Sequence, residues 1–257
     1  MKKLIALALA LTFVFSFAAC SKAPAATADG NEAKSEFAGQ TLVMGSSCDF
    51  PPYEFVNDDG TYAGIDIDIA TAVCEKLGAK LEVKDMDFNG IIAAVENKAV
   101  SFGMSGLTIN DERKESVYFS TPYETAVQAI LVLEDSKVAS KDDLEGAKIG
   151  VQEGTTGADY CIEDFGQENV NEYKKYSLAI EALQKGMVDC VVVDGPVAKQ
   201  FAAEIDGLKV LDTAYAEEEY AVAFNKADTA LLEAFNAALA ELEADGTIQV
   251  IYDKYAD

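Results

Sequence analysis

The sequence predicts an α/β protein whose strands form mostly parallel sheets. Short apolar stretches of strand type alternate along the chain with stretches whose apolar residues recur at helical spacing, and this order is typical of parallel sheets flanked by helices. Two extended apolar stretches, residues 126–133 and 220–224, bracket a central block of roughly 90 residues that has strands and helices of its own. We therefore expect the central block to form a second lobe.

In the first part of the body, strands are predicted at residues 41–45, 81–83 and 102–107 and helices at residues 65–77 and 89–97. The first helix is the clearest, because Ile65, Ile69 and Val73 recur at a spacing of four and Gly78 can adopt the left-handed conformation that ends a helix. Residues 81–83 alternate between apolar and polar side chains, as a strand does. Two prolines within residues 46–52 exclude regular structure from the connection after the first strand.

Later in the chain, strands are predicted at residues 148–151 and 190–193 and helices at residues 156–165 and 177–185. The first of these helices follows a glycine-rich turn, and the second ends before Gly186. Residues 190–193 are wholly apolar, which favours a buried strand. After the second bracketing stretch, apolar residues from Leu232 to Leu242 recur at helical spacing and predict one long helix that ends at Gly246.

The first twenty residues have the features of an export signal. Two lysines follow Met1, and residues 4–17 are almost wholly apolar but too short to cross a membrane at about 20 residues per crossing. We therefore predict a cleaved signal peptide at residues 1–19. The segment 17–20 resembles the bacterial lipobox, whose cysteine, here Cys20, is diacylated, although the lipobox prefers leucine where this chain has Phe17. Plain secretion with cleavage a few residues later is the alternative.

Residues 20–36 are predicted to carry the lipid on Cys20 and to form a flexible tether, because they contain almost nothing that could be buried. The folded part is expected to begin near Phe37. Four cysteines remain, and their spacing matches no zinc or redox motif. We expect them to be buried free thiols, although an exported protein can oxidise them in any of three pairings. They are Cys48, Cys74, Cys161 and Cys190.

Composition excludes several classes of function. The 257 residues contain 45 acidic and 20 basic side chains, a net charge of −25 that repels phosphate backbones, so nucleic acid is not an expected partner. The chain has no histidine, which excludes Ser-His-Asp and Cys-His mechanisms and the usual histidine-containing metal sites. We expect neither a cofactor nor a metal.

Residues 85–96 nevertheless match the calcium loop of an EF-hand, with Asp-x-Asp-x-Asn-Gly followed by a glutamate at the twelfth position. An EF-hand needs a helix that enters this loop, whereas residues 81–83 predict a strand. The end of the pattern also falls within the helix predicted at residues 89–97. We therefore interpret the pattern as part of the fold and not as a calcium site.

Seven segments agree in order and spacing with one family. They are residues 49–55, 60–68, 87–88, 105–113, 119–123 and 154–157, and Asp194. Through them, nearly the whole mature chain resembles the extracellular solute-binding proteins of amino-acid ABC transporters. The resemblance implies the type II periplasmic-binding-protein fold, in which two α/β lobes are joined by two crossing strands and enclose the ligand. The implied boundaries are 37–127 and 222–257 for lobe I and 128–221 for lobe II.

The resemblance also implies how a free amino acid would be held. Arg113, the only arginine, is implied as the partner of the carboxylate, which its parallel donors fit in a bidentate manner. A surface ion pair with its acidic neighbours is the alternative. Asp194 follows the strand at 190–193, where ligands of α/β sheets bind, and is implied as the partner of the ammonium group; otherwise it only begins a turn. Further contacts to the backbone of the ligand are implied for Ser105, Gly106 and Thr108 in the first lobe and for Thr156, at a helix start, in the second.

The side chain of the ligand is expected between Phe50 and Phe88, although both rings could be ordinary core residues. Relatives that take cationic or amide ligands commonly carry an acid where this chain has Ser47. A buried cation without a partner costs several kcal/mol, so we expect a neutral, polar amino acid, with Gln152 as a side-chain contact. Asp49, two residues from Ser47, could compensate for the missing acid.

The sequence therefore predicts a lipid-anchored, monomeric binding protein on the outer face of a bacterial cytoplasmic membrane or in the periplasm. Its partners would be an amino acid and the permease and ATPase of an importer. Two alternatives share the fold. One is an enzyme similar to the cyclohexadienyl dehydratases, for which Glu153 is the nearest candidate acid. The other is a ligand-sensing module without transport.

Overall fold

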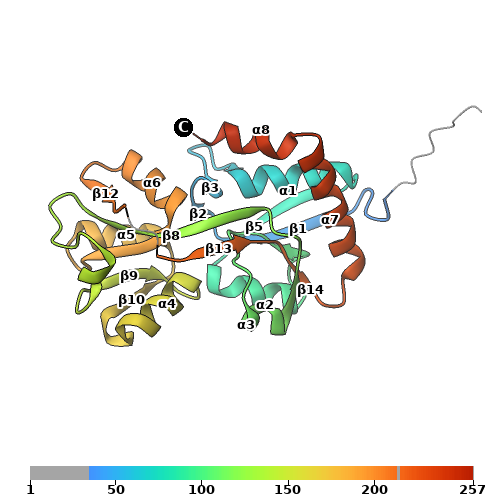
Figure 1. Cartoon of the computed structure of the whole chain (residues 1–257). Helices are drawn as coiled ribbons and strands as arrows, with labels where there is room; N and C mark the ends of the chain where they lie inside the picture. The colour runs from blue at the N-terminus through green and yellow to red at the C-terminus, as the bar shows by residue number, and fades with distance from the viewer. Residues whose placement is uncertain (1–34, 213–214, 257) are drawn as a thin grey trace, which may run out of the picture. The chain divides into compact units, whose positions relative to one another are not determined.

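The computed structural model describes residues 35–212 and 215–256, which build two lobes around two separate sheets (Figure 1). The predicted signal peptide, Cys20 and the tether up to residue 34 lie outside the described residues. Within the described ranges, no helix is long and apolar enough to span a bilayer.

The first lobe contains a five-stranded sheet of order β5-β1-β6-β14-β7 and a small three-stranded sheet of order β2-β3-β4. The strands of the larger sheet are β1 (Thr41–Ser46), β5 (Lys80–Asp85), β6 (Phe102–Gly103), β7 (Val117–Phe119) and β14 (Ala223–Asn225). The small sheet is formed by β2 (Asp49–Phe50), β3 (Glu54–Val56) and β4 (Tyr62–Ala63). The helices are α1 (Ile65–Lys76), α2 (Ile91–Glu96), α3 (Asp111–Ser116), α7 (Thr229–Ala244) and α8 (Thr247–Lys254), with a 3-10 turn, η1 (Phe88–Gly90).

The second lobe contains the sheet of order β10-β9-β11-β8-β12, and β13 adds to it by pairing with β8. Its strands are β8 (Glu124–Leu133), β9 (Ile149–Gln152), β10 (Val170–Tyr173), β11 (Cys190–Asp194), β12 (Leu208–Val210) and β13 (Glu217–Tyr220). Its helices are α4 (Thr156–Phe165), α5 (Tyr176–Gln184) and α6 (Gly195–Glu204), with 3-10 turns η2 (Lys141–Leu144) and η3 (Gln167–Asn169).

Helix α1 shows how local sequence forms these elements. Ile69 and Val73, two of the residues at the predicted spacing of four, are fully buried. The helix begins after Gly64, whose φ of +127° is a conformation that glycine adopts readily. A Cβ atom at Gly64 would lie only 2.1 Å from the carbonyl oxygen of Tyr53. The predicted helix at this place is confirmed, and so is the glycine that ends it, since Gly78 has a φ of +67°.

Both larger sheets are mixed, which corrects the expectation of mostly parallel strands. In the first lobe β1 is parallel to β5 and β6, whereas β14 is antiparallel to β6 and β7. In the second lobe β9 is parallel to β10 and β11, whereas β8 is antiparallel to β11 and β12. The antiparallel strands are those through which the chain passes from one lobe to the other, so they enter each sheet against the direction of its βα units.

Strands β8 and β13 form an antiparallel pair that links the lobes (Figure 1). The stretch predicted as one strand at residues 220–224 is divided, because β13 ends at Tyr220 and β14 begins at Ala223 in the other sheet. The strand predicted at 102–107 is also shorter than expected, since β6 ends at Gly103. The chain turns at Gly106, which has a φ of +53°, and a Cβ atom there would lie 2.8 Å from the ring of Phe50. This turn carries Ser105 and Thr108 out of the sheet.

The four cysteines of the folded part are buried as free thiols in the structure. Burial raises the pKa of Cys48 and of Cys161 to about 12. Such thiols are almost entirely protonated at neutral pH, so they act as small apolar side chains and not as nucleophiles.

Candidate functional site

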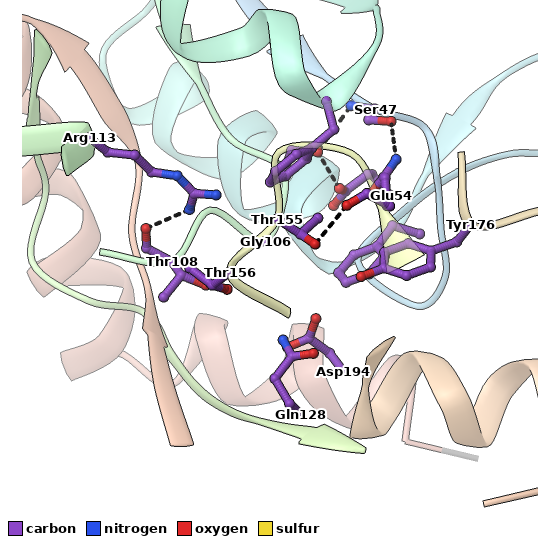
Figure 2. A pocket seen from close by; sticks show the side chains of 14 residues that line it. Ser47, Glu54, Gly106, Thr108, Arg113, Gln128, Thr155, Thr156, Tyr176 and Asp194 are labelled. Atoms are coloured by element: carbon purple, nitrogen blue, oxygen red, sulfur yellow. Dashed lines mark hydrogen bonds between the residues drawn. The ribbon is translucent and has the colours of Figure 1, made fainter. Parts of the chain in front are cut away.

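One pocket brings together residues from both lobes (Figure 2). It contains all ten residues that the sequence predicted for the ligand site: Ser47, Phe50, Phe88, Ser105, Gly106, Thr108, Arg113, Gln152, Thr156 and Asp194. Four further residues line it that the sequence analysis missed: Glu54, Gln128, Thr155 and Tyr176. The pocket encloses only about 10 Å³, which is roughly the space that one water molecule needs.

The pocket lies where parallel strands of the two sheets end. Ser47 follows β1 and the loop with Ser105 follows β6, while Gln152 and Asp194 are the last residues of β9 and β11. The carboxyl ends of parallel strands are the usual place for ligands in α/β sheets, because the following loops and helix starts leave polar backbone groups free there. Each lobe therefore contributes its strand ends to one site.

Arg113 reaches the pocket from the first turn of α3. That turn is held by Asn110, whose side chain accepts a hydrogen bond from the backbone N–H of Arg113 at 2.8 Å. Arg113 is 9% exposed, and its guanidinium donates from Nη1 to the carbonyl oxygen of Thr108 at 2.7 Å and from Nη2 to that of Gly154 at 3.0 Å. Burial lowers the pKa of Arg113 below its ordinary value, and the charge of Glu218 opposes that change. The side chain thus stays a cation and touches backbone of both lobes.

The start of α4 faces Arg113 from the second lobe. Thr155 caps this helix, because its side chain accepts a hydrogen bond from the N–H of Ala158 and donates one to the carbonyl oxygen of Gln152 at 2.8 Å. The hydroxyl groups of Thr156 and Thr108 lie 3.5 Å apart across the two lobes. The first N–H groups of a helix have no partner within it and favour an anion. The guanidinium and this helix start can therefore hold one carboxylate between them.

Asp194 and Gln128 lie together at another end of the pocket, separated from Arg113 (Figure 2). Gln128 Nε2 donates a hydrogen bond to Asp194 Oδ1 at 2.9 Å. Asp194 is only 5% exposed, and burial, followed by the charge of Glu218, raises its pKa to about 7. A buried carboxyl group with this pKa gains strongly from a cation nearby, because a positive charge stabilises its ionised form.

Rings and amides form the remaining wall. The ring of Phe50 stacks on that of Tyr176 with centroids 5.5 Å apart, and the ring of Phe88 lies 5.5 Å from the guanidinium carbon of Arg113. Each predicted aromatic residue therefore has its own partner, and the proposed sandwich of a ligand side chain between them stays a prediction. Gln152 Nε2 lies 3.5 Å from Ser47 Oγ.

Glu54 brings an acid to the pocket that the sequence did not single out, since an isolated acid in an apolar stretch carries no pattern. Ser105 Oγ donates to Glu54 Oε1 at 2.6 Å, and Asp66 Oδ2 accepts hydrogen bonds from the N–H of Gly106 at 2.9 Å and from the Tyr123 hydroxyl at 2.8 Å. Burial and the neighbouring Asp66 raise the pKa of Glu54 well above its ordinary value. Burial and the nearby charge of Asp66 therefore favour the protonated, neutral form of Glu54.

Asp49 does not line the pocket, although it lies only two residues from Ser47 in the sequence. Its Oδ1 accepts a hydrogen bond from Ser47 Oγ at 3.2 Å, and its Oδ2 accepts from the N–H and hydroxyl of Ser177, both at 3.3 Å. Asp49 therefore joins the first lobe to α5 of the second. Its carboxylate accepts hydrogen bonds from these donors and does not line the pocket.

The residues of the EF-hand-like pattern also make contacts between the lobes. Asp87 pairs with Lys174 at 3.1 Å, and Asn89 Nδ2 donates to Glu153 Oε1 at 3.0 Å. Asp85 Oδ1 accepts a hydrogen bond from the N–H of Cys48 at 3.0 Å. Within residues 35–212 and 215–256, no cluster of three acidic or cysteine side chains could hold a metal ion. Glu153, the candidate acid of the enzyme alternative, lies at this contact and is not part of the pocket lining.

Known proteins resemble the chain over most of its length. The sequence profile described as bacterial extracellular solute-binding proteins, family 3, matches residues 42–257. The arginine-binding extracellular protein ArtP of Bacillus subtilis (strain 168) is 33% identical over 265 residues, which cover 99% of this chain and 98% of ArtP. Two solved structures are described as an ancestral arginine-binding protein, one bound to arginine, at 39% identity and a TM-score of 0.79, and one bound to glutamine, at 38% identity and a TM-score of 0.80. Each comparison covers 84% of this chain and 97% of that protein.

These likenesses confirm the resemblance that the sequence segments carried, and with it the two-lobe fold class. The relatives named are described as amino-acid-binding proteins and not as enzymes.

Replacing Asp194 with asparagine is expected to stabilise the protein without added amino acid at pH 8 and to have little effect at pH 4. Because burial raises the pKa of Asp194 from 3.8 to about 7, the folded state between these values holds a proton that the unfolded state has lost. The free energy of unfolding therefore falls as the pH rises through this window, and asparagine removes that loss. A shift of about three pKa units corresponds to on the order of 4 kcal/mol at pH 8.

Urea denaturation of Asp194→Asn and of wild type at both pH values measures this difference. Asp206→Asn, an exposed position in the same lobe, is the matched control and should change little at either pH. An equal change in the free energy of unfolding at pH 4 and pH 8 for Asp194→Asn would contradict the assignment.

Proposed function

Because this chain belongs to family 3 of the bacterial extracellular solute-binding proteins, we propose that it captures one free L-amino acid between its lobes and delivers it to the permease and ATPase of an importer. In this proposal the protein acts as a monomer, with lobe I at residues 37–127 and 222–257 and lobe II at residues 128–221. The separation between a buried cation and a buried acid in one pocket is the observation that carries it.

The two ends of this pocket suit the two charged groups of an amino acid. Arg113 and the start of α4 offer N–H donors to a carboxylate, and Asp194 offers an acceptor to an ammonium group. Each charge of the ligand would form an ion pair with a buried group of the protein, either Arg113 or Asp194. Neither group has an ion-pair partner of its own within 4 Å among the described residues. Binding across the lobes would also favour the closed arrangement, because the two lobes contact the ligand together.

A neutral, polar side chain fits the remaining wall best. Ser47 and Gln152 offer a hydroxyl and an amide, and burial beside Asp66 raises the pKa of Glu54 and so favours its neutral form. Asp49, which could have balanced a cation, is bonded to Ser177 instead. The similar structure described as an ancestral arginine-binding protein bound to glutamine supports a neutral amide as one class of ligand.

We further propose that the protein is exported and anchored by lipid on Cys20 to the outer face of the membrane. The apolar run at residues 4–17 and the lipobox-like segment at 17–20 support export and lipid attachment. A tether at residues 20–36 would let the folded part meet a permease in the same membrane.

Substitution of Arg113 by alanine is expected to weaken amino-acid binding by at least roughly 100-fold, because the carboxylate would lose its charged partner inside a buried site. Lysine at this position should give an intermediate loss, since it keeps the charge but not the paired donors. Calorimetric titration with the twenty common L-amino acids and L-cystine measures both effects. Lys114→Ala, an exposed neighbour on α3, is the control and should bind like wild type. Failure of the wild-type protein to bind any of these compounds would refute the proposed function.

Ser47→Asp is expected to shift the preference of the protein from L-glutamine towards L-arginine and L-lysine. The new carboxylate would give a cationic side chain the partner that it lacks in the wild type, and we expect the ratio of the two affinities to change at least roughly tenfold. Competition binding between L-glutamine and L-arginine measures the ratio, and Ser47→Ala separates loss of the hydroxyl from gain of charge. A wild-type protein that already prefers L-arginine would contradict the neutral-ligand proposal but not amino-acid capture.

Replacing Cys20 with alanine is expected to release the protein from the membrane fraction. In cells grown with radiolabelled palmitate, the wild-type protein should carry the label and sediment with membranes, whereas Cys20→Ala should do neither. Cys74→Ala keeps the lipid site and serves as the control. An unlabelled wild-type protein in the soluble fraction would favour plain secretion instead.

A further inference from the structure

Glu218 is a buried acid that neither the sequence analysis nor the proposed ligand contacts include. It lies on β13, one of the two strands that link the lobes, and its neighbours Glu217 and Glu219 are exposed while Glu218 is 4% exposed. A run of three glutamates gives no sign of which member is buried. Only the alternation of the strand, paired with β8 through Glu218 and Ala126, turns this side chain inward.

The buried carboxylate of Glu218 joins both ends of the site through direct hydrogen bonds. Its Oε2 accepts one from Gln128 Nε2 at 2.9 Å and one from Thr108 Oγ1 at 3.1 Å. The same amide nitrogen of Gln128 donates to Asp194 Oδ1 at 2.9 Å. Both N–H groups of the Gln128 amide are therefore used, one on each carboxyl group, which holds the two acids on either side of a single amide.

Two buried oxygens at this place have no hydrogen-bond partner among the described residues: Glu218 Oε1 and Gln128 Oε1. Leaving an acceptor without a donor costs about 1–3 kcal/mol, and more where the group is charged. Gln128 itself lines the pocket. Hydrogen-bond acceptors without a donor therefore lie beside Asp194, and a positively charged group with several N–H donors would suit them.

The other titratable groups around Asp194 do not supply that charge. Tyr220 on β13, Tyr176 on α5 and Tyr53 on the loop before β3 all have a pKa raised by burial, and they are neutral. The charge of Glu218 acts on Arg113, but the guanidinium donates its hydrogen bonds to backbone carbonyl groups. Two acids therefore lie on either side of one amide, and within residues 35–212 and 215–256 neither of them forms an ion pair.

We propose that Glu218 is a positioning residue, which orients Asp194 through the Gln128 amide and adds its negative charge behind the place where Asp194 would bind the α-ammonium group of the ligand. This inference rests on the proposed function. Its consequence is that an ammonium ligand favours the ionised state of Asp194, so affinity rises with pH until Asp194 is fully ionised. Because a nearby like charge opposes ionisation, removing the charge of Glu218 should move that rise to lower pH.

The first test needs no ligand. In protein with ¹³C-labelled aspartate carboxyl groups, the signal of Asp194 is identified by its absence from Asp194→Asn, and its pKa is measured by NMR titration. Glu218→Gln is expected to lower the pKa of Asp194 by about one unit. Glu219→Gln, the exposed neighbour on the same strand, should leave it unchanged. An unchanged pKa of Asp194 in Glu218→Gln would overturn the proposal, and thermal unfolding establishes that each variant is folded.

The second test measures binding of L-glutamine and L-arginine from pH 5 to pH 9. In the wild type and in Glu219→Gln, affinity should rise up to tenfold per pH unit below pH 7, and in Glu218→Gln the rise should occur about one unit lower. A uniform loss of affinity at all pH values, with no shift of the profile, would show a merely structural role and overturn the proposal. N-acetyl-L-glutamine, which lacks the ammonium group, should not bind. If the wild type binds no amino acid, the proposed function fails, whereas the NMR result still decides the coupling of Glu218 to Asp194.

Discussion

The site depends on the burial of one guanidinium group in an acidic protein. Arg113 is the only arginine, and water cannot solvate it where it lies, so the protein must supply oxygen acceptors. It does so with two backbone carbonyl groups, one from each lobe. Because these acceptors are neutral, the positive charge is solvated without being cancelled. A carboxylate that reaches Arg113 therefore meets a full charge in a place of low dielectric constant, where it is worth most.

Burial also destabilises the negative charge of the acids near the site. Asp194, Glu54 and Asp66 are all buried, and burial raises the pKa of each. Glu54 accepts a hydrogen bond from Ser105, and Asp66 accepts two, from Gly106 and Tyr123, whereas Asp194 accepts one from the Gln128 amide. Burial of Asp194 without a charged partner therefore lowers the stability of the folded protein at neutral pH, and such a cost is expected of a group that pairs with a ligand.

Contacts around the rim of the pocket contribute differently from those inside it. The pairs of Asp87 with Lys174 and of Asp85 with Lys175 lie at distances of 3.1 and 3.6 Å and are partly exposed. Exposed ion pairs are worth about 0–1 kcal/mol and weaken with salt. They can align the lobes, but in the proposed function the buried groups Arg113 and Asp194 would contribute more, because charges pair more strongly in a buried site. The residues of the calcium-like pattern belong to this rim, which accounts for their polarity without a metal.

Local periodicity was enough to predict the class of fold, five of the eight described α-helices and half of the described strands, and segments whose order and spacing match a family indicated ten of the fourteen residues that line the pocket. The sequence could not show that residues 220–224 divide between two sheets, that the sheets are mixed, or that Glu54, Gln128, Thr155 and Tyr176 line the pocket. Those features depend on pairing between distant segments, which leaves no local pattern. Glu218 is the clearest case, since three identical residues in a row differ only in which way the paired strand turns them. The pairing of β13 with β8 buries the middle one and brings it to the Gln128 amide that also binds Asp194, because burial and charge coupling arise from neighbours that the chain brings together on folding.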